Sequence, residues 1–287
     1  MSVFLNLIYE PLSYPFMLRG VLAALMVGVV CATVGTYVVL RGMAFFGDAL
    51  AHSILPGIAV GYLVSGGARQ SLFWWALIAA VFSSVGIGTI TREAKVREDT
   101  AIGIVFAGMF ALGIALISTV RSYSVDLTHF LFGDVLGVST TDLILIAVFG
   151  LLIILTVIFF YKEFLVLSFD PLLAATLRLP ARWLEYLLLV LIALAIVVSL
   201  QTVGVALMVA MLVTPAAAAF LLTRRLPLMM TLAAIIASAS GVIGLYISFY
   251  ASVASGAAIV LVSTAFFALA WLARTVRRNS LTNGKVK

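Results

Sequence analysis

The sequence is poor in the residues on which soluble proteins depend. Charged residues occupy 10% of the 287 positions and hydrophobic residues 64%, whereas about a quarter of the residues of a soluble domain are charged. One cysteine excludes an intramolecular disulfide and says little about the redox compartment. Cys31 lies in an apolar run, so we expect it to pack there.

The motifs of common catalytic sites are also missing. No G-x-x-x-x-G-K-[ST] loop occurs, so the chain is not expected to hydrolyse ATP by itself. No H-E-x-x-H motif, Ser-His-Asp set or paired carboxylates appear either. We therefore expect a protein that is not an enzyme and holds no permanently bound cofactor. The net charge of +6 does not indicate a nucleic-acid partner, because the cations stand at the ends of hydrophobic runs instead of on one solvated face.

Long hydrophobic runs are what the sequence does contain. A stretch of about 20 apolar residues crosses the hydrocarbon core of a bilayer as a helix. The candidate runs are 17–40, 43–66, 72–90, 101–120, 143–161, 184–201, 204–222, 228–250 and 253–273. The runs 184–201 and 204–222 are almost continuous, so an eight-span alternative stays open. The sequence predicts an all-α polytopic membrane protein with eight or nine spans, forming one transmembrane domain over 1–287 and beginning at or near Met1.

The cations predict the orientation, since Lys and Arg concentrate in cytoplasmic connections. Fourteen of the 17 fall on alternate connections. The other three are Arg19, Arg69 and Arg121. With nine spans, this bias places the N-terminus outside and the C-terminus in the cytoplasm, with 274–287 as a basic tail near the lipid headgroups.

One pair of ionisable residues stands inside a span. Asp48 and His52 are separated by four residues in GDALAHS, so on a helix they project from the same face about 6 Å apart along the axis. Carboxylate oxygen with imidazole nitrogen suits Mn²⁺, Zn²⁺ or Fe²⁺ better than Cu⁺. Two ligands are too few for a hydrated dication, but a second copy meeting this helix would supply two more.

Other interpretations of this pair stay open. Asp48 and His52 could neutralise one another by an intrahelical hydrogen bond, or belong to a proton relay, which would need further acids or histidines along the path. Outside the spans, Asp126, His129 and Asp134 are a candidate outer site through which a metal enters, although such charges are usually just solvated. Glu98, Asp99 and Thr100 precede a span and are typical of helix N-terminal capping.

Three segments resemble a known family. RGMAFFGDALAHS (41–53), HFLFGDVLGVS (129–139) and TVGVALMVAMLVTPAAAA (202–219) resemble the permease subunits of bacterial ABC importers for manganese, zinc or iron, and the similarity runs over nearly the whole chain. The resemblance implies that two permeases pair around a translocation path in the plasma membrane, with two cytoplasmic ATPase subunits below and a metal-loaded binding protein outside. It also implies that Asp48 and His52 match the family's intramembrane metal ligands.

The inner connection 161–183 is half apolar and contains two prolines. Such a segment either lies in the headgroup plane or docks in a partner's groove. The resemblance makes 163–182 the segment that couples the permease to the ATPase. Its contact residues would be Phe169, Asp170, Pro171, Leu172, Leu173, Ala174, Leu177 and Arg178. Leu172 stands where the family commonly has an acid and Arg178 where it has a glycine, which would permit a positive φ.

The sequence thus predicts a permease that imports a divalent transition metal by alternating access, driven by ATP hydrolysis in partner subunits. Uptake should weaken in acid, because the pair binds a cation only with His52 neutral and Asp48 ionised. A permease for metal chelates, a proton-coupled secondary transporter and a membrane scaffold that transports nothing are the rival hypotheses. The choice among Mn²⁺, Zn²⁺ and Fe²⁺ stays open, since the ligand pair accepts all three.

Overall fold

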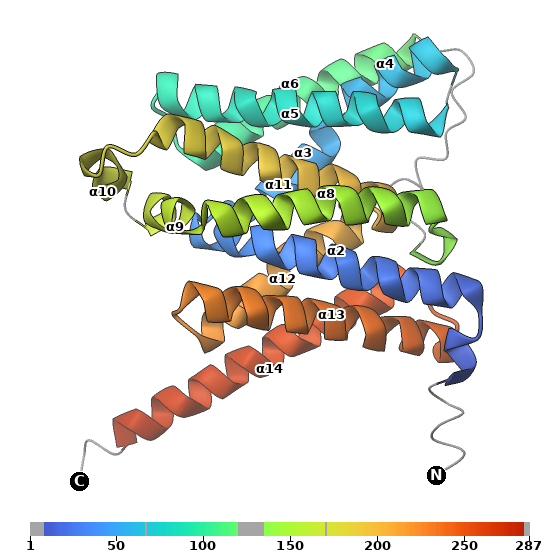
Figure 1. The fold of residues 1–287 in the computed structure, drawn as a ribbon, viewed down its shortest axis with the longest axis vertical. Coiled ribbons are helices and arrows are strands. Elements are labelled where there is room, and N and C mark those ends of the chain that lie inside the picture. The colour runs from blue at the N-terminus through green and yellow to red at the C-terminus, as the bar shows by residue number, and fades with distance from the viewer. Residues whose placement is uncertain (1–8, 67, 120–134, 170, 284–287) are drawn as a thin grey trace.

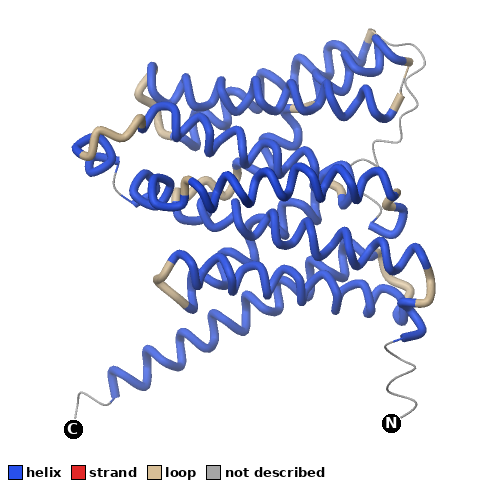
Figure 2. The backbone as a smooth tube through the Cα atoms, in the orientation of Figure 1, coloured by secondary structure: helices blue, strands red, loops and turns tan. Residues whose placement is uncertain are grey.

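The computed structural model describes residues 9–66, 68–119, 135–169 and 171–283. Within these ranges the chain is helical and contains no strand (Figure 2). The predicted all-α class is therefore confirmed. The elements are α2 (Pro15–Leu40), α3 (Phe46–Ser53), α4 (Leu55–Ser65), α5 (Arg69–Glu93), α6 (Glu98–Ser118), the 3₁₀ helix η1 (Val135–Gly137), α8 (Thr140–Phe159), α9 (Tyr161–Phe169), α10 (Pro171–Thr176), α11 (Ala181–Val203), α12 (Val205–Leu222), α13 (Leu226–Ala251) and α14 (Ser255–Asn283).

Across the described residues, nine helical segments are long and apolar enough to cross a bilayer. Helices α3 and α4 together make one of them, Phe46–Ser65. The nearly continuous runs that left an eight-span alternative open form two separate helices, α11 and α12, each of spanning length. They are joined at Gly204, whose φ of +79° lies in the left-handed region that glycine adopts without a steric penalty.

Helices α2 and α11 form the centre of the molecule (Figure 1). In each of them, 72% of the most apolar window is buried inside the chain, against 17% in α6. Helix α2 contacts α8, α11, α12 and α13, whereas α3 and α4 pack against α5 and α6. Cys31 of α2 is fully buried, with its Sγ 3.3 Å from the Oγ of Ser199 in α11, as expected of a packing residue.

Two glycines permit close approach between helices. A Cβ at Gly35 of α2 would lie 1.9 Å from the carbonyl oxygen of Leu212 in α12. A Cβ at Gly57 of α4 would lie 2.3 Å from the carbonyl oxygen of Trp75 in α5. Small residues at such crossings let helix backbones pack closely in membranes.

The cationic connections gather at one end of the molecule. The end of α2, helices α9 and α10, the turn between α12 and α13, and the C-terminal end of α14 lie on one side in Figure 1, and the start of α2 lies on the other. This grouping is what the charge bias requires of a cytoplasmic end. The orientation of the termini stays a prediction, as does the assignment of 1–287 to one domain.

Candidate functional site

The candidate metal pair lies on α3, directly after a tight helix end. At the end of α2, Gly42 has φ +73°, and the N–H groups of Gly42 and Met43 donate to the carbonyls of Val39 and Val38 over 3.2 and 2.9 Å. These two hydrogen bonds, with a glycine in the left-handed conformation, form a Schellman motif, which ends a helix and redirects the chain. Helix α3 begins three residues later with Phe46.

The apolar residues of α3 are buried and its polar pair is not. Asp48 and His52 have side chains 40% and 26% exposed, whereas Leu50 between them is fully buried. The predicted common face is therefore present. An ionisable pair exposed on a membrane span is costly in lipid, so such residues normally face a partner or a water-filled path.

The imidazole of His52 is bonded to backbone and not to the carboxylate. Its Nδ1 lies 2.9 Å from the carbonyl oxygen of Asp48 and 3.8 Å from the Asp48 carboxylate. A carbonyl can only accept a hydrogen bond, so Nδ1 carries the proton. The lone pair of a neutral His52 is then on Nε2. The side chains of the pair are too far apart for the mutual hydrogen bond considered above.

Two phenylalanines of α6 flank the imidazole. The rings of Phe106 and Phe110 lie 5.9 and 5.8 Å from the His52 ring, both near perpendicular to it. They are stacked on each other at 5.7 Å. These contacts hold the ring orientation and keep water from that side. The sequence did not predict this aromatic wall of Phe106 and Phe110. The spans contain many phenylalanines, and no spacing distinguishes these two from the others.

One chain offers two candidate metal ligands, Asp48 and His52. Among the described residues, no group of three or more His, Cys, Asp or Glu side chains is close enough to hold an ion. The candidate outer residues Asp126, His129 and Asp134 lie outside the described residues, so that site stays a prediction. Asp142, which follows them, caps α8 by exchanging hydrogen bonds with Ser139.

The predicted N-terminal capping by Glu98, Asp99 and Thr100 is confirmed in part, since both acids stand in the first turn of α6 but no side-chain hydrogen bond caps the helix. Helix α6 begins at Glu98 itself, with Arg97 as N-cap and no side-chain cap hydrogen bond. Glu98 instead forms an ion pair with Arg41 from the end of α2. Its carboxylate thus pairs with a guanidinium, and its negative charge still stands at the N-terminal end of α6, where the helix dipole favours it.

The predicted coupling segment forms α9 and α10, which project at one end of the molecule (Figure 1). Phe169, Leu173 and Leu177 are exposed, and Ala174 is buried. Asp170 lies outside the described residues, and Pro171 and Leu172 contribute the first turn of α10. Docking of an ATPase on these residues stays a prediction.

Arg178 adopts the backbone conformation for which the family commonly has a glycine. Its φ is +54°, and the N–H of Leu179 donates to the carbonyl of Ala174 over 3.1 Å, closing α10. The turn expected of a glycine is therefore made by arginine. A left-handed conformation costs a residue with a Cβ about 1–2 kcal/mol.

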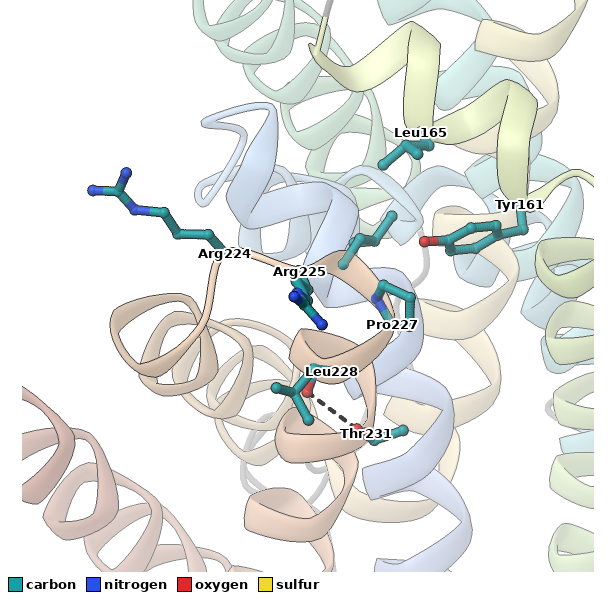
Figure 3. Close-up of a pocket in the computed structure, with 8 residues that line it drawn as sticks. Tyr161, Leu165, Arg224, Arg225, Pro227, Leu228 and Thr231 are labelled. Atoms are coloured by element: carbon teal, nitrogen blue, oxygen red, sulfur yellow. Dashed lines mark hydrogen bonds between the residues drawn. The ribbon is translucent and has the colours of Figure 1, made fainter.

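A hollow of about 710 Å³ opens between α9 and the start of α13 (Figure 3), and neither Asp48 nor His52 lines it. Its lining includes Tyr161, Leu165, Arg224 and Arg225, and no acidic residue or histidine. In Figure 3, Arg224 points out of the hollow. Such a lining does not suit a cation.

Comparison with known proteins places the chain in a family. A model described as the ABC 3 transport family matches residues 13–274. The chain belongs to the ABC 3 transport family. It is a multi-pass membrane permease of the bacterial plasma membrane, as the resemblance in three segments predicted.

Relatives of this chain are named as membrane proteins of metal transport systems. The manganese transport system membrane protein MntC of Halalkalibacterium halodurans is 45% identical over 260 residues, covering 91% of this chain and 88% of that protein. The chelated iron transport system membrane protein YfeD of Yersinia pestis is 40% identical over 273 residues, covering 94% and 89%.

Two solved structures share the fold. PsaBC from Streptococcus pneumoniae, in complex with Fab, aligns with a TM-score of 0.79 at 36% identity over 93% of this chain and 95% of that one. An inward-facing putative metal-chelate type ABC transporter aligns with a TM-score of 0.70 over 89% and 85%. At 14% identity, the second likeness is one of fold alone.

Proposed function

We propose that this chain carries a bare divalent transition metal into the cytoplasm, with Asp48 and His52 as the ligands of the cargo. The observation that carries the proposal is the partly exposed pair on α3, in which the backbone holds Nδ1 of His52 and leaves the lone pair of a neutral imidazole on Nε2. A mixed oxygen and nitrogen ligand set suits Mn²⁺, Fe²⁺ and Zn²⁺. Relatives named for manganese and iron transport support Mn²⁺ and Fe²⁺ as the first cargoes to test.

A second copy of the permease would complete the site. One pair supplies two ligands, and a two-fold axis beside α3 would double this to two carboxylates and two imidazoles. The sparse burial of α6, which carries the aromatic wall, leaves a broad apolar face next to the pair. A partner permease on that face would remove Asp48 and His52 from lipid.

The energy would come from two cytoplasmic ATPase subunits that dock on α9 and α10. The exposed Phe169, Leu173 and Leu177 are apolar anchors of the kind that fill a groove on a partner. A metal-binding protein outside would deliver the ion. ATP binding and hydrolysis would then alternate the access of the α3 pair between the two sides.

The protein residues divide the work in this mechanism. Asp48 supplies the charge that attracts a dication, and His52 supplies a lone pair in a fixed direction because its Nδ1 is held by the backbone. Phe106 and Phe110 limit water on one side of the imidazole, which strengthens the electrostatic attraction between ligand and ion. The ion leaves when the helices around the pair separate.

The test is metal uptake by the complete importer reconstituted in vesicles. Asp48→Ala and His52→Ala should each reduce uptake of radioactive Mn²⁺ by at least about 100-fold, because even the loss of residues that merely orient a metal ligand costs 10- to 100-fold. Asp99→Ala is the matched control, since this acid is 58% exposed at the start of α6 and has one long contact, 3.8 Å to Arg97. Near-normal uptake by both ligand variants would overturn the proposal.

The same vesicles separate the rival hypotheses. A permease for chelates would take up iron bound to a chelator and ignore free Mn²⁺, and it would not need Asp48. A proton-coupled transporter would work without ATP, and a scaffold would move no metal at all. Competition between Mn²⁺, Fe²⁺ and Zn²⁺ then ranks the cargoes.

A further inference from the structure

Four charged side chains from four helices meet at the end of the molecule that bears α10. The carboxylate of Glu185 in α11 accepts hydrogen bonds from Arg41 Nη2 over 3.2 Å and from Arg92 Nε over 2.7 Å. Arg41 also pairs with Glu98. The order Glu98, Arg41, Glu185, Arg92 alternates acid and base, so the cluster is neutral overall.

This cluster is largely withdrawn from solvent at its centre. The side chains of Arg41 and Glu185 are 10% and 12% exposed. A buried ion pair adds little net stability over apolar residues of the same size, because desolvation offsets the attraction. Removing one partner, in contrast, leaves an unpaired charge. The charges therefore hold one relative position of the four helices more strongly than they hold the fold together.

Two members of the cluster precede, in the sequence, the segments that carry the candidate metal ligands and the aromatic wall. Arg41 caps α2 and lies seven residues before Asp48, across the tight turn at Gly42. Glu98 begins α6, the helix whose Phe106 and Phe110 flank His52. The ion pair of Arg41 with Glu98 thus joins the starts of the two segments that carry the ligands and the aromatic wall.

The third member stands next to the coupling segment. Glu185 is in the second turn of α11, and the four residues between α10 and α11 are held by the turn at Arg178 and Leu179. Helix α10 also contacts α11 directly. A displacement of α10 would therefore reach Glu185 over a short, closed stretch of chain.

We propose that Glu185 is a positioning residue that transmits movement of α10 to the metal site through Arg41. Arg92 of α5 donates a hydrogen bond to the second carboxylate oxygen of Glu185, so α5 is connected to the same network. This inference rests on the proposed function, because it presumes that α10 responds to an ATPase. Without the Glu185 charge, α11 could move while α3 and α6 stay in place, so ATP would be hydrolysed without transport.

Other contacts between α11 and α5 should preserve the fold when Glu185 is changed. The hydroxyls of Thr89 and Tyr186 lie 3.1 Å apart. The Tyr186 ring also packs closely on Gly88, where a Cβ would lie 2.8 Å from the ring. Leu184 and Leu188 on either side of Glu185 are fully buried.

The same two helices supply a matched control. Arg182 of α11 and Glu93 of α5 form an ion pair at 3.7 Å with both side chains exposed, by 65% and 69%. Exposed pairs of this kind contribute little. Glu93→Gln removes the acid of this exposed pair, which lies outside the coupling segment 163–182, without touching the cluster.

The experiment measures metal ions transported per ATP hydrolysed in vesicles holding the complete importer. Glu185→Gln should lower this ratio by about 2- to 30-fold, the range that mutations within a coupling network produce. Mn²⁺ binding by the purified permease should not change, because Asp48 and His52 are intact. Glu185→Asp should recover part of the ratio, and Glu93→Gln should leave it unchanged.

Several outcomes would overturn the inference. A normal ratio in Glu185→Gln would do so, as would equal losses of Mn²⁺ binding and transport, which indicate a structural defect. If Glu185→Gln does not fold, Arg92→Gln carries the test, since it removes the other side of the link from a more exposed position. Failure of the proposed function would give a different result. The unmodified complex would then transport no metal, or Asp48→Ala would transport it at a near-normal rate.

Discussion

His52 donates its Nδ1 proton to the backbone carbonyl of Asp48, one turn earlier in α3, over 2.9 Å. The bond fixes the tautomer of the neutral imidazole, so the lone pair of Nε2 is the one available to a metal. The Asp48 carboxylate lies 3.8 Å from Nδ1 of His52, beyond hydrogen-bond distance. This arrangement is the one that the proposed role of the two side chains as metal ligands requires.

If two copies share one site, a single defective copy should be enough to disable it. Wild-type and His52→Ala permeases carrying different affinity tags can be co-expressed and purified through both tags as mixed dimers. We expect Mn²⁺ uptake by these dimers to fall at least about tenfold, since half of the imidazole ligands are gone. Mixed dimers with Asp99→Ala are the control. Retention of half the uptake would mean that each copy works alone.

The aromatic wall should contribute to affinity. Phe106→Ala removes the ring that touches both His52 and Phe110, so the imidazole gains freedom and water. We expect Mn²⁺ binding to weaken about two- to tenfold, in line with the 0.5–1.5 kcal/mol of an aromatic contact. Titration calorimetry on the purified permease measures this. Phe82→Ala, on an exposed ring of α5, should leave the affinity unchanged, and an equal change in both variants would rule out a local effect.

The left-handed turn at Arg178 gives a test of the coupling segment. Arg178→Gly should keep or slightly raise thermal stability, because glycine adopts a φ of +54° without strain. Arg178→Val should lower stability by about 1–2 kcal/mol, since a β-branched residue is strained there. Thermal unfolding of the purified protein and its binding to the ATPase report the two effects. Equal behaviour of the two variants would show that the turn conformation has no influence.

Close packing at Gly35 predicts a large effect of one methyl group. In Gly35→Ala, the new Cβ would meet the Leu212 carbonyl at 1.9 Å, so α2 and α12 must separate. We expect a loss of about 1–3 kcal/mol, as for other overpacked sites. The matched variant is Gly103→Ala in α6, where a Cβ meets nothing within 4 Å and helix propensity should raise stability slightly. A smaller loss at Gly35 than at Gly103 would contradict the packing described.

The spans and the metal pair were readable from sequence for the same reason, namely that both are local. An apolar window of spanning length has few alternative structures, and a spacing of four residues fixes a common helix face. The network around Glu185 is not local. Arg41 and Glu98 are separated by 57 residues, Arg92 and Glu185 by 93, and Arg41 and Glu185 by 144. No pattern within one helix indicates which ends of different helices meet.

Glu98 shows why a local interpretation is incomplete when a residue also has a distant partner. An acid in the first turn of a helix is typical of capping. No residue near Glu98 in the sequence indicates that Arg41 is its partner. Glu185 carried one local signal, an acid among the leucines of WLEYLLLV. An ionisable residue so placed indicates a partner, although the sequence does not name it.

The burial of Cys31 has a practical consequence. The thiol is fully enclosed between α2 and α11 beside Ser199, and the chain contains no other cysteine. Cysteines introduced on the exposed surfaces of α10 and α6 would be the ones to react with a spin label or a fluorophore, in a chain that keeps its native Cys31. Distances between such labels during ATP turnover would then follow the coupling movement directly.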